Sequence, residues 1–147
     1  MITECAPVLG FEGQYKFLSN FYPSEVEFEF VKYPTVEHAY QAAKTCDYQQ
    51  RMKIQQAITP GAAKRLGRSV TLRENWDSIK FQIMLDLVTQ KFSKPPFSIW
   101  LKNTGDSYLE ETNWWGDTYW GVCKGKGKNR LGAILMYVRQ NLQDESI

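Results

Sequence analysis

Histidine and cysteine are scarce in this chain of 147 residues. His38 is the only histidine, so metal sites that need two or three imidazoles are excluded, as is a Ser-His-Asp triad built on any other histidine. The three cysteines are odd in number and show no C-x-x-C spacing, which argues against a disulfide framework and a zinc site. The sequence therefore predicts neither a metal nor a cofactor.

An excess of one charge and a long apolar run are also missing. The net charge of +2 is too small for a protein that coats nucleic acid, so no general nucleic-acid binding is expected. No apolar run approaches the length of a membrane span, and the first residues show no basic segment followed by an apolar one. We expect no membrane contact and a soluble, cytoplasmic protein.

Apolar residues make up 43% of the chain and charged residues 23%, which is typical of a folded globular protein. The chain shows no internal repeat and no linker, so we predict a single domain over residues 1–147. Periodicity and capping residues predict an α+β fold that is predominantly helical. Helices are expected at residues 36–44, 48–57, 60–67, 76–92, about 96–104 and 130–142.

Strands take a smaller share of the prediction. Residues 26–31 alternate apolar and acidic side chains, and we expect them to pair with residues 13–22 as a small hairpin or sheet. Residues 107–112 predict one further short strand. Ser19 and Asn20 lie between large apolar residues, where they either close a turn or offer short polar groups to a ligand.

The helix predicted from residue 36 carries an unusual polar stripe. Glu37, Tyr40, Gln41 and Lys44 follow one another at i, i+3, i+4 and i+7, so they share one face. One interpretation is a solvated face on which Glu37 pairs with a neighbour one or two turns away. The other is a cleft wall that offers a general base beside polar binding groups. Trp76, at the start of another predicted helix, also has two interpretations: it packs in the core or it faces a cleft.

The stretch from Trp114 to Arg130 combines aromatic and basic residues. Gly121-x-x-x-Gly125-Lys126 has one residue too few for a P-loop, and a dinucleotide-binding fingerprint also fails. Either a mobile basic surface loop or an anion-binding loop before a helix N-terminus fits the pattern. The tryptophans near the lysines also resemble a stacking platform with a basic rim, which favours a nucleotide ligand over a long polymer.

Three carboxylates, Glu37, Glu111 and Asp117, come from separate predicted elements flanked by aromatics. Cleavage of a glycosidic bond to a base needs a carboxylate to handle water and negative charge to stabilise an oxocarbenium-like sugar. It also needs an aromatic side chain to hold the leaving base. The three carboxylates and the aromatic residues that flank them can supply all three functions.

Ordered motifs over most of the chain resemble one family. They are Lys16-Phe17-Leu18-Ser19-Asn20-Phe21, Pro34-Thr35-Val36-Glu37-His38-Ala39-Tyr40-Gln41-Ala42-Ala43-Lys44, Trp76-Asp77, Thr104-Gly105-Asp106 through Leu109-Glu110-Glu111, Asp117-Thr118-Tyr119-Trp120-Gly121, and Gly127-Lys128-Asn129-Arg130-Leu131-Gly132-Ala133-Ile134-Leu135-Met136. From about residue 11 to 142 the chain resembles the NADAR, or YbiA-like, family. Asn113-Trp114-Trp115-Gly116 is one residue longer and more aromatic than the family pattern, a difference that bears on substrate choice.

The resemblance implies a compact, largely helical YbiA-like domain and an N-glycosidase that cleaves base–ribose bonds. Some relatives split phosphorylated riboflavin intermediates and others remove ADP-ribose from guanine, and the family is associated with NAD and ADP-ribose metabolism. The implied catalytic residues are Glu37, Glu111 and Asp117. Together with the polar stripe and the Ser19–Asn20 turn, this gives the predicted substrate-binding residues: Ser19, Asn20, Tyr40, Gln41, Lys44, Trp76, Trp120, Gly121 and Asn129.

The sequence thus predicts metal-independent hydrolysis of an N-glycosidic bond in a nucleotide-like small molecule or in ADP-ribosylated guanine. Glu37 would activate water or stabilise the developing cation, with help from Glu111 or Asp117. The alternative from another class is a non-catalytic module that binds NAD or ADP-ribose. A single-strand nucleic-acid module is a third hypothesis, which the small net charge disfavours.

Overall fold

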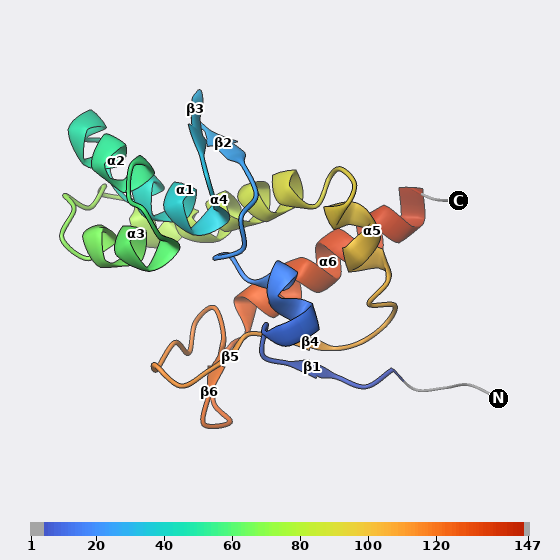
Figure 1. Cartoon of the computed structure of the whole chain (residues 1–147). Coiled ribbons are helices and arrows are strands. Elements are labelled where there is room, and N and C mark those ends of the chain that lie inside the picture. Colours follow the sequence, from blue (N-terminus) through green and yellow to red (C-terminus); the bar gives the residue numbers. More distant parts are fainter. Residues whose placement is uncertain (1–4, 146–147) are drawn as a thin grey trace. The chain divides into compact units, whose positions relative to one another are not determined.

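The computed structural model describes residues 5–145, and Figure 1 shows its elements along the chain. Contacts between Cα atoms divide these residues into two units, which we call unit 1 (residues 5–19 and 92–145) and unit 2 (residues 20–91). The predicted α+β, predominantly helical fold is confirmed. The single domain over the whole chain stays a prediction, and its terminal extensions lie partly outside the described residues.

Unit 2 is built around the helix that carries the polar stripe. Helices α1 (Val36–Ala43), α2 (Tyr48–Gln55) and α3 (Pro60–Gly67) begin where the sequence predicted, after Thr35, Asp47 and Thr59. Each of these three side chains accepts a hydrogen bond from the backbone N–H three residues further on. Helices α2, α3 and α4 (Trp76–Lys91) all pack against α1 (Figure 1), and all eight residues of α1 are buried.

The single histidine stabilises the start of α1. His38 is buried, and its Nε2 lies 3.0 Å from the carbonyl oxygen of Ala57, between α2 and α3. Because a carbonyl only accepts, Nε2 carries the proton in this contact. Nδ1 lies 2.7 Å from the hydroxyl of Thr35, so both ring nitrogens are used inside the protein. His38 therefore has a structural role.

The predicted pairing of residues 13–22 with residues 26–31 is wrong. Gly13–Leu18 forms a 3-10 helix, η1, and the hairpin instead joins β2 (Val26–Phe28) to β3 (Val31–Tyr33). Glu29 and Phe30 form the two-residue turn with φ of 46° and 71°. Positive φ at both turn positions matches the twist of the two strands, which allows this tight connection. The alternation seen in the sequence was right, but the strand turns back after three residues.

Unit 1 combines two short parallel ladders with two helices. Strand β1 (Val8–Leu9) pairs with β4 (Leu109–Glu110), and β5 (Thr112–Asn113) pairs with β6 (Val122–Cys123). Helix α6 (Arg130–Glu145) packs on α5 (Phe97–Lys102) and on β4. The predicted strand at residues 107–112 is thus shorter, and it divides between two ladders.

The two long helices bury most of the predicted apolar stripes. In α4, Trp76, Met84, Leu87 and Val88 are buried, whereas Ile79 and Ile83, at helical spacing on the same apolar stripe, are only half-buried. In α6, the buried apolar residues are Leu131, Ile134, Leu135 and Val138. Four aromatic rings of unit 1 make edge contacts at centroid distances of 5.2–6.5 Å around the buried Phe92, and they belong to Phe17, Phe92, Phe97 and Trp100.

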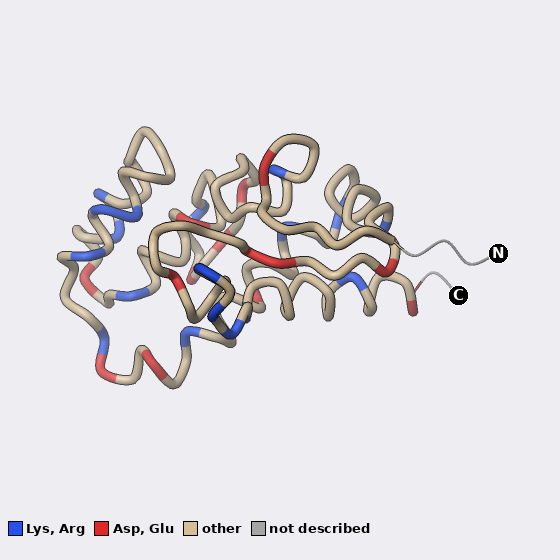
Figure 2. Tube along the Cα trace, turned by 90° about the horizontal axis from the view of Figure 1, so that it is seen from below, with Lys and Arg blue, Asp and Glu red and all other residues tan. Residues whose placement is uncertain are grey.

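Charged residues are mixed along the backbone trace. Basic and acidic positions follow one another in both units, and neither sign is confined to one of them (Figure 2). No helix in residues 5–145 has the length and apolarity required to cross a bilayer.

Lys91, at the end of α4, gives a test of the packing in unit 2. Its side chain is 4% exposed, its Nζ lies 5.8 Å from the centroid of the Tyr22 ring, and burial lowers its pKa from 10.5 to about 7. Between about pH 7 and pH 10.5, Lys91 is protonated in the unfolded chain and deprotonated in the folded chain. The stability cost of burying Lys91 is therefore complete below pH 7 and disappears as the pH rises toward 10.5.

We predict that Lys91→Met stabilises the protein more at pH 6 than at pH 9, by a difference of about 3 kcal/mol. Urea unfolding at the two pH values measures this difference, with Lys94→Met at an exposed position as the control. An equal effect of Lys91→Met at both pH values would contradict the assignment.

Candidate functional site

The polar stripe of α1 lies inside unit 2. Glu37 is 7% exposed, Tyr40 6% and Gln41 4%, and Lys44, just after the helix, is half-buried. The interpretation of a solvated face is therefore wrong. Its second part is correct, because Nε2 of Gln41 donates a hydrogen bond of 2.8 Å to Oε1 of Glu37 one turn away. The helix dipole also favours the ionised form of a carboxylate on the first turn of a helix.

Asn20 lies at the N-terminus of α1. Its carbonyl oxygen accepts a 3.1 Å hydrogen bond from the backbone N–H of Glu37, and its side-chain nitrogen lies 3.5 Å from the sulfur of Met84. The structure thus brings the backbone of Asn20 to the backbone of Glu37, and its side chain to Met84. Ser19 is half-buried and is the last residue of the first segment of unit 1.

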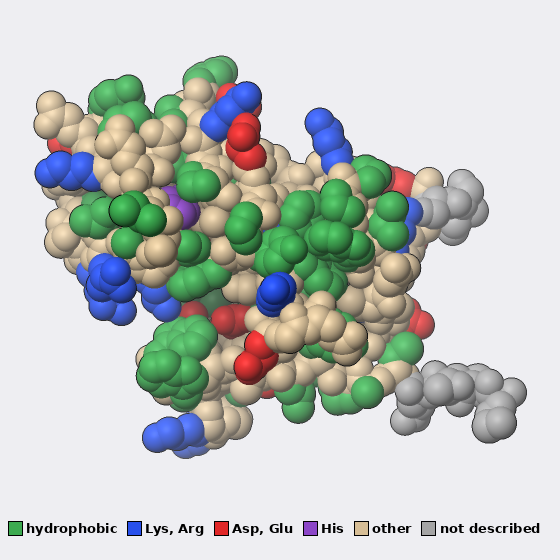
Figure 3. All heavy atoms as spheres, viewed as in Figure 1, with side chains coloured by type: hydrophobic (Ala, Val, Ile, Leu, Met, Phe, Trp, Pro, Cys, Tyr) green, Lys and Arg blue, Asp and Glu red, His purple; other side chains and the backbone are tan. Residues whose placement is uncertain are grey.

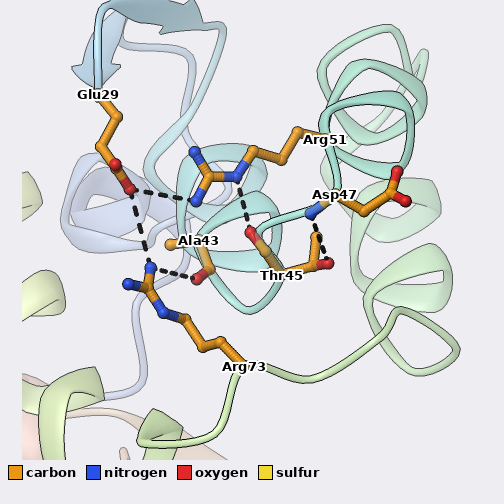
Figure 4. A network of polar contacts seen from close by, with 6 residues as sticks. All are labelled: Glu29, Ala43, Thr45, Asp47, Arg51 and Arg73. Atoms are coloured by element: carbon orange, nitrogen blue, oxygen red, sulfur yellow. Dashed lines mark hydrogen bonds and ion pairs between the residues drawn. The ribbon is translucent and has the colours of Figure 1, made fainter.

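Two arginines stabilise the C-terminal end of α1 (Figure 4). Nε of Arg51 donates 2.7 Å to the carbonyl of Thr45, and Arg73 donates 3.4 Å to the carbonyl of Ala43. Both guanidinium groups pair with one oxygen of Glu29, at 3.1 and 3.7 Å. Positive charge at this end complements the partial negative charge of the helix C-terminus. Glu29 and Arg73 were not predicted as site residues, because both lie outside every motif in the sequence.

The segment that carries Arg73 also brings Trp76 to the polar stripe. The backbone N–H of Arg73 donates 2.8 Å to the carbonyl of Lys44, which holds the segment before α4 against the end of α1. The Trp76 and Tyr40 rings then meet at a centroid distance of 5.2 Å and an angle of 54°. Nζ of Lys44 lies 5.8 Å from the centroid of the Tyr40 ring. The structure therefore brings together five predicted residues of unit 2: Glu37, Tyr40, Gln41, Lys44 and Trp76.

Lys44 lies in a field of positive charge. Burial lowers its pKa, and the nearby cations Lys64, Arg68 and Lys80 lower it further, while the negative charge of Glu37 acts in the opposite direction. Figure 3 shows basic side chains at the surface over α3, to which Lys64 belongs. Several cations beside a carboxylate suit a ligand that carries a phosphate and a reacting centre close together.

A second group of predicted residues meets in unit 1. Oδ1 of Asn129 accepts 3.0 Å from the backbone N–H of Glu111, and its Nδ2 donates 3.0 Å to the carbonyl of Leu109. Gly121 packs so closely that a Cβ there would overlap the Glu111 carbonyl and lie 2.9 Å from Cγ of Glu111. Asn129 and Gly121 therefore fix the backbone that carries Glu111.

Asp117 closes the loop between β5 and β6. Its Oδ1 accepts hydrogen bonds from the backbone N–H groups of Tyr119 and Trp120, at 3.1 and 2.9 Å. The Trp120 ring makes an edge contact with Tyr119 at a centroid distance of 4.7 Å. Five of the predicted residues of this unit (Glu111, Asp117, Trp120, Gly121 and Asn129) thus belong to one interlocked segment, and Ser19 is the sixth.

The same loop exposes two tryptophans. Trp114 is 84% exposed and Trp115 47%, and their rings meet edge to face at 5.7 Å. Figure 3 shows hydrophobic side chains over this loop with basic side chains at their edge. Four exposed cations follow in the sequence, and none forms an ion pair in the described part of the chain: Lys124, Lys126, Lys128 and Arg130.

Metal ligands do not gather in either unit. Within residues 5–145, no three His, Cys, Asp or Glu side chains come together as a group that could hold a metal ion.

Comparison with known proteins shows the family. The NADAR domain matches residues 10–143 of this chain. The chain belongs to the NADAR family. It is 37% identical to N-glycosidase YbiA of Escherichia coli over 132 residues, and the match covers 86% of this chain and 81% of that protein. It is 38% identical to an N-glycosidase of Nostoc punctiforme over 137 residues, and the match covers 88% of this chain and 87% of that protein.

Two further comparisons concern the fold and the activity of this NADAR protein. The NMR structure of Escherichia coli YbiA matches with a TM-score of 0.83 and 34% identity, over 98% of this chain and 89% of that one. A riboflavin biosynthesis protein of Vibrio vulnificus is 37% identical over 134 residues, which are 88% of this chain and 36% of that protein. With N-glycosidases among relatives of this identity and coverage, the chain is an N-glycosidase.

The hydrogen bonds of Asn129 predict a structural effect. We expect Asn129→Ala to lower the free energy of unfolding by about 2 kcal/mol, because it takes the Asn129 side chain away from the Glu111 N–H and from the carbonyl of the buried Leu109. Denaturant unfolding measures the change, with Asn141→Ala at an exposed position of α6 as the control. A loss no larger than that of the control would show that these contacts do not stabilise the loop.

Proposed function

We propose that this NADAR protein hydrolyses the N-glycosidic bond between a base and a ribose in a phosphorylated, nucleotide-like substrate. Water attacks the anomeric carbon, the C–N bond breaks, and its electron pair leaves with the base nitrogen, which takes up a proton. The reaction is carboxylate-assisted and needs no metal. The observation that carries this proposal is the buried Glu37, held by Gln41 beside two aromatic rings and a cluster of cations.

Glu37 is the proposed catalytic carboxylate. It takes a proton from the attacking water, or stabilises the positive charge that develops on the sugar as the base leaves. Two features support this role: the carboxylate is almost completely removed from solvent, and its amide partner limits the directions in which it can point. Both properties strengthen electrostatic stabilisation, because fixed charges act more strongly where water is excluded.

The neighbours of Glu37 supply the proposed binding contacts. Trp76 and Tyr40 offer planar surfaces that suit a base, and Lys44 offers positive charge for the phosphate. Because the pKa of Lys44 is lowered, its cation is lost at a lower pH than that of an ordinary lysine as the pH rises. A phosphate held by Lys44 would accordingly bind less tightly under alkaline conditions.

Glu111 and Asp117 stay the predicted assisting carboxylates. We also keep as predictions the binding roles of Ser19, Asn20, Trp120, Gly121 and Asn129. For Asp117 and Asn129, the observed hydrogen bonds to backbone groups already explain why these residue types are needed.

Two substrates fit this proposal. The riboflavin biosynthesis protein among the relatives favours a phosphorylated intermediate of riboflavin formation, while ADP-ribosylated guanine offers the same type of bond. The alternative of a non-catalytic module that binds NAD or ADP-ribose is disfavoured by the N-glycosidases among the relatives.

We predict that Glu37→Gln lowers kcat at least about 100-fold, because the amide keeps the shape of the side chain and removes the base. The measurement is mass-spectrometric detection of released base and sugar, in the presence of a metal chelator. Riboflavin-pathway intermediates, ADP-ribose, NAD and guanine-ADP-ribosylated DNA are tested side by side.

The matched control is Glu25→Gln, which changes an exposed carboxylate of unit 2 that forms only a surface ion pair with Lys32. The control should keep wild-type turnover. A Glu37→Gln enzyme within about tenfold of wild type, roughly 1.4 kcal/mol, would remove Glu37 from the central role. Binding of an intact ligand without release of base from any substrate would instead favour the binding module.

A second candidate function has one specific observation in its favour. The exposed Trp114–Trp115 pair with its unpaired cations matches the surfaces on which single-stranded nucleic acids stack. A flat, exposed tryptophan suits a ligand that makes several contacts along a chain, since small molecules usually bind where most of their surface is buried.

For this candidate we predict salt-dependent binding of a short oligo-dT, weakened at least about tenfold by Trp114→Ala. Fluorescence anisotropy of a labelled oligonucleotide measures it, and Tyr137→Ala, an exposed aromatic on α6, is the control. Equal affinities of the two variants would assign Trp114 no part in nucleic-acid binding.

A further inference from the structure

The hydrogen bond between Gln41 and Glu37 is buried. Both residues lie on α1, whose residues are all buried, and the donor Nε2 is 2.8 Å from the acceptor Oε1. A hydrogen bond from an amide to an ionised carboxylate is stronger than one between neutral groups. Because the surroundings are buried, solvent cannot replace this donor if it is lost.

The other end of the same amide has no partner. Oε1 of Gln41 is buried and accepts no hydrogen bond from any described residue. Rotation of the amide by half a turn would place this oxygen against the carboxylate of Glu37, where two acceptors repel each other. The hydrogen bond to Glu37 therefore determines the amide orientation, although this leaves one acceptor without a partner.

Gly67 restricts the amide from the opposite side. It is the last residue of α3, and a Cβ there would overlap Oε1 of Gln41 and lie 2.7 Å from its Cδ and 3.1 Å from its Cβ. The backbone of α3 therefore fits against the Gln41 side chain only because residue 67 has no side chain.

We infer that Gln41 is a positioning residue for Glu37, and that Gly67 holds its amide in place. The inference rests on the proposed catalytic role of Glu37, and it assigns Gln41 a different task from the direct substrate contact that the sequence predicted. Nε2 of Gln41 is engaged with the carboxylate and its Oε1 is buried, so its effect on the substrate passes through Glu37.

The first test measures kinetics with Gln41→Met, which keeps approximately the length of the side chain and removes the donor. We expect kcat to fall about 10- to 100-fold with little change in KM, since the lost hydrogen bond involves a charged group. The acidic limb of the pH–rate profile should move to higher pH, because the ionised carboxylate loses a donor. Gly67→Ala should also lower kcat and move the acidic limb of the profile to higher pH.

The matched control is Gln82→Met. Gln82 also donates to a carboxylate one helical turn away, Oδ1 of Asp86 at 2.9 Å, but on an exposed face of α4. This variant should leave kcat and the pH profile unchanged. Thermal unfolding and circular dichroism of each variant show that the fold is kept.

A double variant tests whether Gln41 acts through Glu37. If it does, adding Gln41→Met to Glu37→Gln lowers kcat by less than about threefold further, since residues that act as one unit are not additive. An equal loss in both backgrounds, or a rise in KM with unchanged kcat, would overturn the inference in favour of a direct substrate contact. Full activity of Glu37→Gln itself would contradict the proposed function, which is a different outcome.

A titration of Glu37 does not depend on activity. The carbon-13 NMR shift of the Glu37 carboxyl, followed against pH, should have its midpoint at higher pH in Gln41→Met than in wild type and in Gln82→Met. The same midpoint in all three proteins would overturn the inference even if no substrate were turned over.

Discussion

The complete burial of helix α1 is the constraint on which unit 2 depends. A short helix rarely hides all its residues, and this one carries a carboxylate, an amide, a phenol and an imidazole. Each of these groups requires a partner inside the protein, because burying a polar group without a hydrogen bond costs free energy. The imidazole bonds to Thr35 and to the α2–α3 connection, the amide bonds to the carboxylate, and the arginines bond to backbone carbonyls at the end of the helix.

The local features of unit 2 could be predicted from the sequence. Thr35, Asp47 and Thr59 signal helix starts because a capping side chain bonds to a backbone group three residues away. The Glu37–Gln41 pair follows from helical spacing in the same way. The hairpin prediction failed because a tight turn at Glu29 and Phe30, neither of which is a usual turn residue, interrupts the strand.

The long-range contacts had no such signal. Glu29, Arg51 and Arg73 come from three separate segments and meet only after these have folded around α1. In unit 1, the motif residues Asp117 and Asn129 bond to backbone groups, which a motif cannot distinguish from contact with a substrate. A family pattern records that a residue is needed and leaves open whether the fold or the reaction needs it.

The unpartnered oxygen of Gln41 makes the proposed site a weak point in stability. An apolar side chain of similar size would remove that cost, and replacement of Glu37 together with Gln41 would also remove the buried carboxylate that needs the amide donor, so selection for thermostability alone favours loss of this pair. Engineering of this protein for heat resistance should therefore exclude position 41 from its libraries. Homologues that have lost the reaction but kept the fold are the ones in which an apolar residue is expected there.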